Sequence, residues 1–416
     1  MKPGRLSIDF AALRCPGFRL LGLGQVSSVA GEQILTVAIT VSVLDASGDA
    51  SAVGLVLATR GLASMGFLLA GGVWADRLSR RRVLMAAYLV AALAVGVLVL
   101  IPTRPPLWSL ASVIFVAGAA DAFIRPAFGA ILRSVLADDQ RVSGMALLGI
   151  CVRAGVIAGP AFAVALLADG SPRPAFAVTA ALFMSAALVF WRVREPPWTP
   201  VRGVSMLADV ATGFVEARRR PWLGALLLFS PVSVVFVIAP TQVLLPIVSR
   251  DGFGSDAVFG TALACFGAGG LIGSLAALGW RPRSPGTVAM WSMTLYALVP
   301  LVLLSAPSRW VLFGGYLVAG FGVQTYALRW DIAMQREVPD HLIGRITALA
   351  WLSSFGLMPF GLALTGPLTD LVGTAAVLLL AAGLVLVVPP CLLLVEGMTQ
   401  FRRAPKTHPR AKMSED

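Results

Sequence analysis

The amino-acid sequence predicts an all-α polytopic membrane protein whose twelve transmembrane helices form two pseudo-symmetric halves of six. Composition is the first reason, because 57% of the 416 residues are hydrophobic and 13% are charged, whereas soluble domains average about 45–50% and about 25%. In addition, apolar stretches near the roughly 20 residues that span a bilayer recur along the whole chain. This composition excludes a soluble enzyme, a disordered chain and a small secreted module held by disulfides.

Charged residues, glycine and proline bound the twelve apolar stretches and so define the predicted helices. The first six are Leu20–Leu44, Ala52–Trp74, Val83–Ile101, Leu107–Leu132, Met145–Ala168 and Ala175–Trp191. The second six are Leu223–Val248, Val258–Trp280, Thr287–Leu304, Trp310–Ala333, Ile346–Leu371 and Thr374–Leu394. The first stretch is too long for a signal peptide and lacks a small-residue cleavage site, so we expect it to remain as a helix.

The chain divides into two bundles, a linker and a tail. We expect an N-terminal bundle over 1–191, a cytoplasmic linker over 192–221, a C-terminal bundle over 222–395 and a basic, disordered cytoplasmic tail over 396–416. One helical face of the linker is apolar and consists of Met206, Leu207, Val210, Ala211 and Phe214. This pattern predicts an amphipathic helix on the membrane surface.

Corresponding helices of the two halves carry similar residues. Gly54 and Gly61 in the second predicted helix recur as Gly260 and Gly267 in the eighth, and Val116-Ala117-Gly118 in the fourth recurs as Val318-Ala319-Gly320 in the tenth. Chance similarity between apolar runs is the alternative. Two parallel six-helix repeats are one arrangement of secondary transporters, with the substrate between them near the midplane.

The basic residues predict the orientation in the membrane. Most of the 33 Lys and Arg residues fall in the termini, the linker and alternate loops. The remaining loops contain only Arg104, Arg173, Arg250 and Arg309. Cytoplasmic loops carry such an excess, so we expect a multi-pass protein of the inner membrane with both termini in the cytoplasm. Because this positive-inside rule accounts for the positive charge, we expect no nucleic-acid partner.

The turn between the second and third predicted helices carries a charged motif. It reads Gly72-Val73-Trp74-Ala75-Asp76-Arg77-Leu78-Ser79-Arg80-Arg81-Arg82-Val83-Leu84. Glycine permits a tight turn, and an acid flanked by arginines can form a charge network. The motif resembles the G-x-L-a-D-r-x-G-r-k-x-x-l signature of the major facilitator superfamily, with matches at Gly72, Asp76, Arg77, Arg80 and Arg81. The resemblance implies a gate at the cytoplasmic end; a positive-inside loop with one incidental Asp is the alternative.

The sequence departs from that signature at Trp74 and Ser79, where leucine and glycine are usual. The corresponding loop of the second half, Gly279-Trp280-Arg281-Pro282-Arg283, keeps only part of the motif. Whether the second half gates in the same way therefore stays open.

The fifth predicted helix resembles a motif of the superfamily's exporters. Arg153 precedes Gly155, Gly159 and Pro160, which match its G-x-x-x-G-P core, although the following glycine pair is absent. Small residues four apart let helices approach closely and proline bends a helix, so ordinary helix packing is an equal alternative. Across the chain, Phe18-Arg19-Leu20, Gly31-Glu32-Gln33 and Arg220-Pro221-Trp222 resemble the bacterial branch of enterobactin exporters and macrolide-efflux-type pumps.

Charged residues inside predicted helices are costly in a bilayer and mark functional sites. Glu32 lies twelve residues from each end of the first helix, with no basic residue within one turn. Asp121 lies near the middle of the fourth helix, and Arg125 lies four residues further on the same face. We expect Glu32, Asp121 and Arg125 to take part in proton coupling. A static Asp121–Arg125 ion pair and a hydrogen-bonded, structural Glu32 are the alternatives.

Further polar residues are candidates for the substrate cavity. They are Gln33, Arg60, Gln242 and Gln324. By contrast, Arg329 and Asp331 lie near the inner end of the tenth helix, and we expect them at the surface. The four cysteines and two histidines are scattered and predict no metal site.

These observations predict a secondary active transporter rather than an enzyme. The chain has no GxxxxGK[ST] phosphate loop, so we expect a proton gradient, and no bound cofactor, to drive export of a drug, siderophore or other small amphiphile. The expected partners are that substrate, protons and lipids, and we expect a monomer. An uptake symporter or facilitator is the alternative. A lipid-modifying membrane enzyme would need a nucleophile–base or metal cluster, which we do not find in the sequence.

Overall fold

A computed structural model describes residues 14–101, 105–136, 141–193, 220–278, 280, 282–305 and 308–401. These residues form helices joined by short turns, and no strand occurs among them. Twelve of the spans are long and apolar enough to cross a membrane, which confirms the predicted fold class. The predicted linker helix lies within 194–219, outside the described residues.

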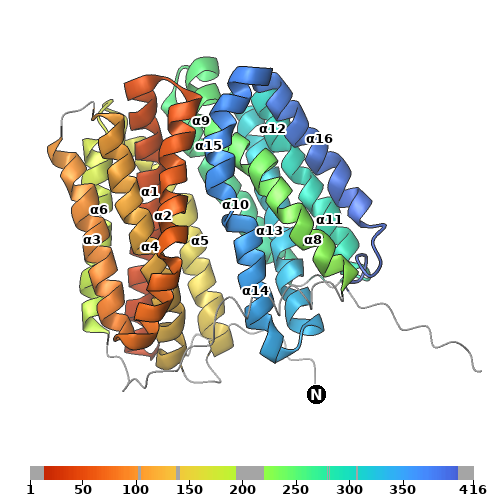
Figure 1. Ribbon diagram of the computed structural model, residues 1–416, viewed down its shortest axis with the longest axis horizontal. Helices are drawn as coiled ribbons and strands as arrows, with labels where there is room; N and C mark the ends of the chain where they lie inside the picture. Colours follow the sequence, from red (N-terminus) through yellow and green to blue (C-terminus); the bar gives the residue numbers. More distant parts are fainter. Residues whose placement is uncertain are drawn as a thin grey trace, which may run out of the picture.

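The first half contains six continuous helices. They are α1 (Pro16–Ser47), α2 (Ala50–Arg77), α3 (Arg80–Leu100), α4 (Leu107–Val135), α5 (Arg141–Leu166) and α6 (Arg173–Arg192). Helix α1 packs against α5 and α6, α2 packs against α4, and α3 packs against α4 and α6. In Figure 1 this half lies on the left and the second half on the right.

The second half contains six spans, three of which are interrupted. Its helices are α8 (Pro221–Ser233), α9 (Ala239–Phe253), α10 (Asp256–Leu278), α11 (Pro285–Thr294), α12 (Leu298–Ser305), α13 (Arg309–Glu337), α14 (Asp340–Phe355), α15 (Met358–Val372) and α16 (Thr374–Leu392). A π-helical segment, Val234–Ile238, joins α8 to α9, and a 3₁₀ turn, Leu295–Ala297, joins α11 to α12. A break at Gly356-Leu357 separates α14 from α15.

Three of the predicted spans are therefore not continuous α-helices. Prolines accompany each interruption: Pro231 and Pro240 flank the π-helical segment, Pro300 follows the 3₁₀ turn, and Pro359 follows the α14–α15 break. Proline donates no backbone hydrogen bond and its ring clashes with the preceding turn. Such local adjustments are tolerated in membrane helices when neighbouring helices cover them.

Two further boundaries differ from the predictions. Helix α2 continues to Arg77, so Gly72 lies within the helix and the turn occurs at Leu78-Ser79. Gly72 therefore does not form the turn itself. The beginning of the expected tail is packed: Met398 and Phe401 are buried, and the Thr399 carbonyl accepts hydrogen bonds from the backbone of α11's first turn.

The helices alternate in direction, so the molecule has two distinct ends. We call the end with the α2–α3 turn and Arg80 the basic end, and the end with the α1–α2 turn the opposite end. The basic end is the lower one in Figure 1, and the α14–α15 span runs upward from it.

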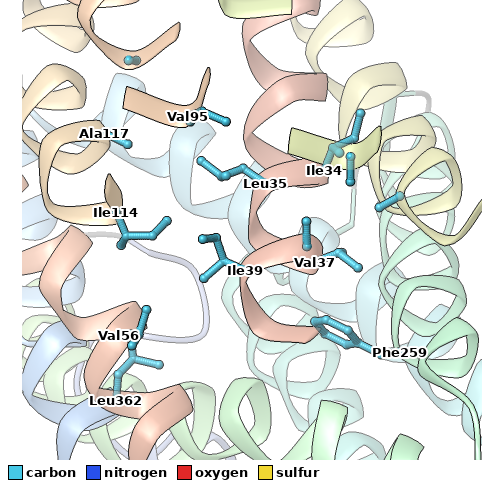
Figure 2. Close-up of a cluster of buried hydrophobic side chains, with 14 of the residues drawn as sticks. Ile34, Leu35, Val37, Ile39, Val56, Val95, Ile114, Ala117, Phe259 and Leu362 are labelled. Atoms are coloured by element: carbon cyan, nitrogen blue, oxygen red, sulfur yellow. The ribbon is translucent and has the colours of Figure 1, made fainter. Parts of the chain in front are cut away.

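The hydrophobic core is centred on α1. Ile34, Leu35 and Ile39 are buried there, and Figure 2 shows them among side chains of α2, α3, α4, α10 and α15. A separate buried cluster surrounds Trp222 at the start of α8 and includes Phe401.

The two halves contact each other through α2 with α15 and through α5 with α10. The repeated glycines lie at these contacts. Gly54 of α2 abuts the backbone carbonyl of Leu362 in α15, and Gly260 of α10 abuts Val164 and the Pro160 carbonyl in α5. A side chain at either glycine would collide, so the repeat noted in the sequence marks where the halves approach closely.

Candidate functional site

A cluster of three charged side chains lies within the first half, contributed by α1, α2 and α4. The Arg60 guanidinium donates from Nε to Oδ2 of Asp121 at 2.9 Å, and its Nη2 lies 2.8 Å from the same oxygen. Arg60 Nη2 also lies 3.4 Å from Oε2 of Glu32. The side chains of Glu32, Arg60 and Asp121 are 27%, 22% and 11% exposed, so the cluster is largely withdrawn from solvent.

This geometry corrects two expectations. The ion partner of Asp121 is not Arg125, four residues further along the same helix. It is Arg60 of α2, which lies 61 positions away in sequence. Glu32 likewise has a basic neighbour, supplied by α2 rather than by its own helix. Arg125 instead extends toward the other half, where its guanidinium carbon lies 5.4 Å from the ring centroid of Trp351 in α14. A cation–π contact of this kind is attractive, so Arg125 links the two halves.

A cavity of about 450 Å³ lies between the halves. Its walls come from α4, α5, α10 and α13, and they are mostly apolar, including Leu148, Val152, Phe266 and Val323. The lining positions run from the middle of these helices toward the basic end. A cavity of this size is typical of small-molecule sites.

Two polar side chains face this cavity from opposite halves. Arg153 of α5 and Gln324 of α13 both line it. Each lies about 18–20 Å from the basic end of its helix, at a rise of about 1.5 Å per residue. Among the described residues, Arg153 makes no hydrogen bond or ion pair; its charge interacts only at longer range with Asp331 of α13.

A second ion cluster joins the halves at the opposite end. Arg250 of α9 makes a two-pronged contact with Asp256 of α10, with Nε–Oδ1 2.9 Å and Nη2–Oδ2 2.6 Å. The same guanidinium lies 2.8 Å from Oδ1 of Asp45, at the end of α1. Asp256 therefore orients Arg250 within the second half, and Asp45 reaches it from the first.

The residues of the α2–α3 motif lie together at the basic end. Gly72, Asp76 and Arg77 belong to the last turns of α2, and their side chains lie outside the described part of the structure. Arg80 and Arg81 begin α3, where the Ser79 hydroxyl accepts from the backbone NH of Arg82. The gate role of the motif stays a prediction.

The helix-5 motif packs α5 between α1 and α10. A side chain at Gly155 would meet Val29, and one at Gly159 would meet Gln33, both in α1. The Pro160 carbonyl faces Gly260 of α10. The motif residues therefore position α5, and with it Arg153, between the two halves.

The other sequence candidates occupy different places. Gln33 contacts Gly159 where α1 packs against α5, and Gln242 is exposed on α9. Neither side chain lines the cavity. Arg329 is buried, which corrects its expected surface position, and it donates to the Trp280 carbonyl at 2.9 Å. Asp331 is exposed, as expected.

Sequence reasoning missed three contributions to these sites. Arg60 was identified as a cavity residue and not as the counter-ion of Glu32 and Asp121. Trp351 and the Asp45–Arg250–Asp256 cluster carried no local motif. The one available signal was that Asp45, Arg250 and Asp256 stand at predicted helix ends on the same side of the membrane.

Comparison with known proteins decides the family. The sequence profile described as Major Facilitator Superfamily matches residues 21–360, most of the chain. The chain belongs to the Major Facilitator Superfamily. As a member it is a membrane transporter and not an enzyme, and the predicted family and fold are confirmed.

Several relatives of this superfamily member are named as exporters. It is 24% identical to macrolide efflux protein A of Streptococcus pyogenes over 379 residues, covering 89% of this chain and 93% of the relative. It is 26% identical to the multidrug efflux pump Tap of Mycolicibacterium fortuitum, with 86% and 91% covered. It is also 26% identical to the enterobactin exporter EntS of Escherichia coli, with 96% of each chain covered.

Solved structures share the superfamily fold. The nucleoside transporter NupG aligns with a TM-score of 0.70 at 15% identity, covering 91% of this chain and 98% of NupG. A bacterial homologue of the iron transporter ferroportin in the inward-facing state aligns with a TM-score of 0.68 at 17% identity, covering 92% and 98%.

Proposed function

We propose that this transporter exports small amphiphilic compounds from the cytoplasm by proton-coupled alternating access. The observation that carries the proposal is the mostly apolar cavity between the halves. The charged cluster of Glu32, Arg60 and Asp121 inside the first half supports the coupling to protons. The names of the relatives, which include a macrolide efflux protein, a multidrug efflux pump and an enterobactin exporter, support the direction and the substrate class.

In this proposal the basic end faces the cytoplasm of a cell whose inner membrane holds the protein. The positive-inside rule supports that orientation. The cavity lies toward the basic end, while the Asp45–Arg250 contact joins the halves at the opposite end. The arrangement therefore corresponds to the inward-facing state, ready to take substrate from the cytoplasm. The α2–α3 motif, with Asp76, Arg77, Arg80 and Arg81, is then the gate that closes the cytoplasmic end after loading.

Charge balance suggests how protons couple to this cycle. Arg60 supplies one positive charge to two carboxylates, so the cluster retains one negative charge when both are ionised. A proton on Glu32 neutralises it, and Glu32 is the better carrier because its 3.4 Å contact with Arg60 is longer than that of Asp121. Arg125 is a second, more distant cation for Glu32. Its contact with Trp351 of the other half ties the charge around Glu32 to the movement of the halves.

The test measures flux in proteoliposomes that hold the purified protein. The probe is labelled enterobactin, with and without an imposed pH gradient of either sign. We expect uphill movement from the basic-end side when the trans compartment is acidic, and its loss in Glu32→Gln with substrate binding retained. A gradient that drives only uptake would instead establish a symporter. Wild-type flux that ignores the gradient, or uphill transport by Glu32→Gln, would contradict proton antiport.

A further inference from the structure

The cavity between the halves combines an apolar wall with one cation that has no close partner. Among the described residues that line it, Arg153 is the one charged side chain and Gln324 is the other polar one. No described residue gives Arg153 a hydrogen bond or ion pair. A guanidinium at this depth of a membrane helix is costly and usually has a functional partner, and here no described residue provides one at contact distance.

We propose that the cavity selects amphiphiles that carry an acidic group, and that Arg153 binds this group. The inference rests on the proposed function only in treating the cavity as the substrate site. The guanidinium of Arg153 has hydrogen-bond donors without acceptors among the described residues. A carboxylate, sulfonate or phenolate of the ligand supplies these acceptors and forms charge-assisted hydrogen bonds with it. Gln324, at the same depth on α13, offers an amide to the same head group from the other half.

The wall suits the remainder of such a molecule. Leu148, Val152 and Val156 of α5 face Phe266 of α10 and Val323 of α13 across the cavity. Moving the apolar part of a ligand from water to these walls lowers its free energy. A side chain at Gly149 would meet nothing within 4 Å, so this position adds space for the apolar body and can be filled by mutation without a clash at Cβ.

Asp331 does not line the cavity, but its charge acts on Arg153. It is seven residues, or two helical turns, from Gln324, which places it on the same face of α13. Its charge interacts with that of Arg153 across the two halves, beyond ion-pair distance. An acidic ligand therefore competes with Asp331 for Arg153, whereas a cationic ligand is repelled by Arg153.

The experiment compares three probes with one naphthyl body and different head groups. Naphthoxyacetate is anionic, naphthoxyacetamide is neutral and naphthoxyethylammonium is cationic. Binding to the purified full chain in detergent is read from the concentration-dependent rise in Tm. We expect the anion to bind at least about tenfold more tightly than the amide, the factor that a charged hydrogen bond supplies, and the cation to bind most weakly.

Variants separate the cavity from general effects of charge. Arg153→Gln should abolish the anion preference while the amide affinity changes by less than about twofold; Arg153→Lys should keep part of the preference because it keeps the charge. Asp331→Asn should increase the preference for the anion, because it removes the carboxylate that competes for Arg153. Arg173→Gln is the control, because Arg173 binds the Ile101 carbonyl at 3.1 Å, away from the cavity. Gly149→Phe should reduce binding of all three probes.

The proposal is overturned if the amide or cation binds as tightly as the anion, if Arg153→Gln keeps the preference, or if the wild type binds none of the probes. Binding in detergent needs no gradient. A failure of proton coupling in the flux assay therefore leaves this result unaffected, and a failure here leaves the coupling result standing.

Discussion

Arg60 contacts two carboxylates from other helices, and this single side chain supplies the positive charge of the cluster. Removing one partner of a largely buried ion pair costs more than the pair contributes, because the remaining charge is left uncompensated. Here two carboxylates, Glu32 and Asp121, depend on one guanidinium.

We predict that Arg60→Gln destabilises the folded protein by about 3–5 kcal/mol, the range for breaking a buried ion pair. Thermal unfolding of the detergent-solubilised protein measures the effect. Glu32→Gln, which removes only the 3.4 Å contact, should cost much less. The double variant Arg60→Gln with Asp121→Asn should recover part of the loss, because it removes the uncompensated charge. A double variant no more stable than Arg60→Gln would contradict the assigned pairing.

The candidate residues could be named from the sequence, but their partners could not. Glu32, Asp121 and Arg125 stand out because an ionisable residue in an apolar helix is conspicuous. The four-residue spacing of Asp121 and Arg125 then favours a local pair. The structure turns Arg125 toward Trp351 and gives Asp121 to Arg60 instead, because contacts between helices decide among several available partners.

At the scale of the element, glycine contacts set how closely helices of opposite halves approach. Gly54 in α2 and Gly260 in α10 occupy equivalent positions of the repeat and contact α15 and α5. Gly118 in α4 abuts the Arg60 backbone in α2, and its counterpart Gly320 in α13 abuts the Phe266 backbone in α10. Equivalent glycines therefore make the same kind of close helix contact in the two halves. One pair does so within each half and the other pair between the halves.

We predict that Gly54→Val destabilises the protein by about 1–3 kcal/mol, the usual effect of overpacking, because the new side chain would displace the Leu362 carbonyl. Transport should fall as well, since α2 and α15 could no longer close together. Gly383→Val is the matched control: it places the same β-branched residue inside a helix, α16, where nothing lies within 4 Å of the new Cβ. Equal losses of stability in the two variants would contradict the close-contact explanation.

At the scale of the whole molecule, the Asp45–Arg250–Asp256 cluster joins the halves at one end while the cavity lies toward the other. Arg250 keeps its two-pronged contact with Asp256 whether or not the halves separate, because both residues belong to the second half. Within the cluster, the contact with Asp45 is the one that crosses between the halves and must break when the opposite end opens.

We predict that Asp45→Asn favours opening of the opposite end, with a stability change of only about 0–1 kcal/mol because the pair is partly exposed. The reporter is Ser51→Cys, whose position abuts Gly366 of α15, in a protein whose four native cysteines are replaced by serine. An impermeant maleimide should react severalfold faster in Asp45→Asn. Asp251→Asn, a neighbouring charge outside the cluster, is the control. Unchanged labelling in Asp45→Asn would show that the contact does not hold this end closed.

The sequence by itself determined the number of spans, their order and the family, because a helix in a bilayer must satisfy its backbone hydrogen bonds within itself. That constraint is local, so apolar length reveals each span, and the Gly72–Leu84 motif adds the family. The breaks at Val234–Ile238 and Gly356, the partners of Arg60 and the position of Arg153 on the cavity were decided only by tertiary structure. These features depend on which helix faces pack together. In lipid, an apolar face that packs on a neighbouring helix has the same kind of sequence as one that faces the membrane.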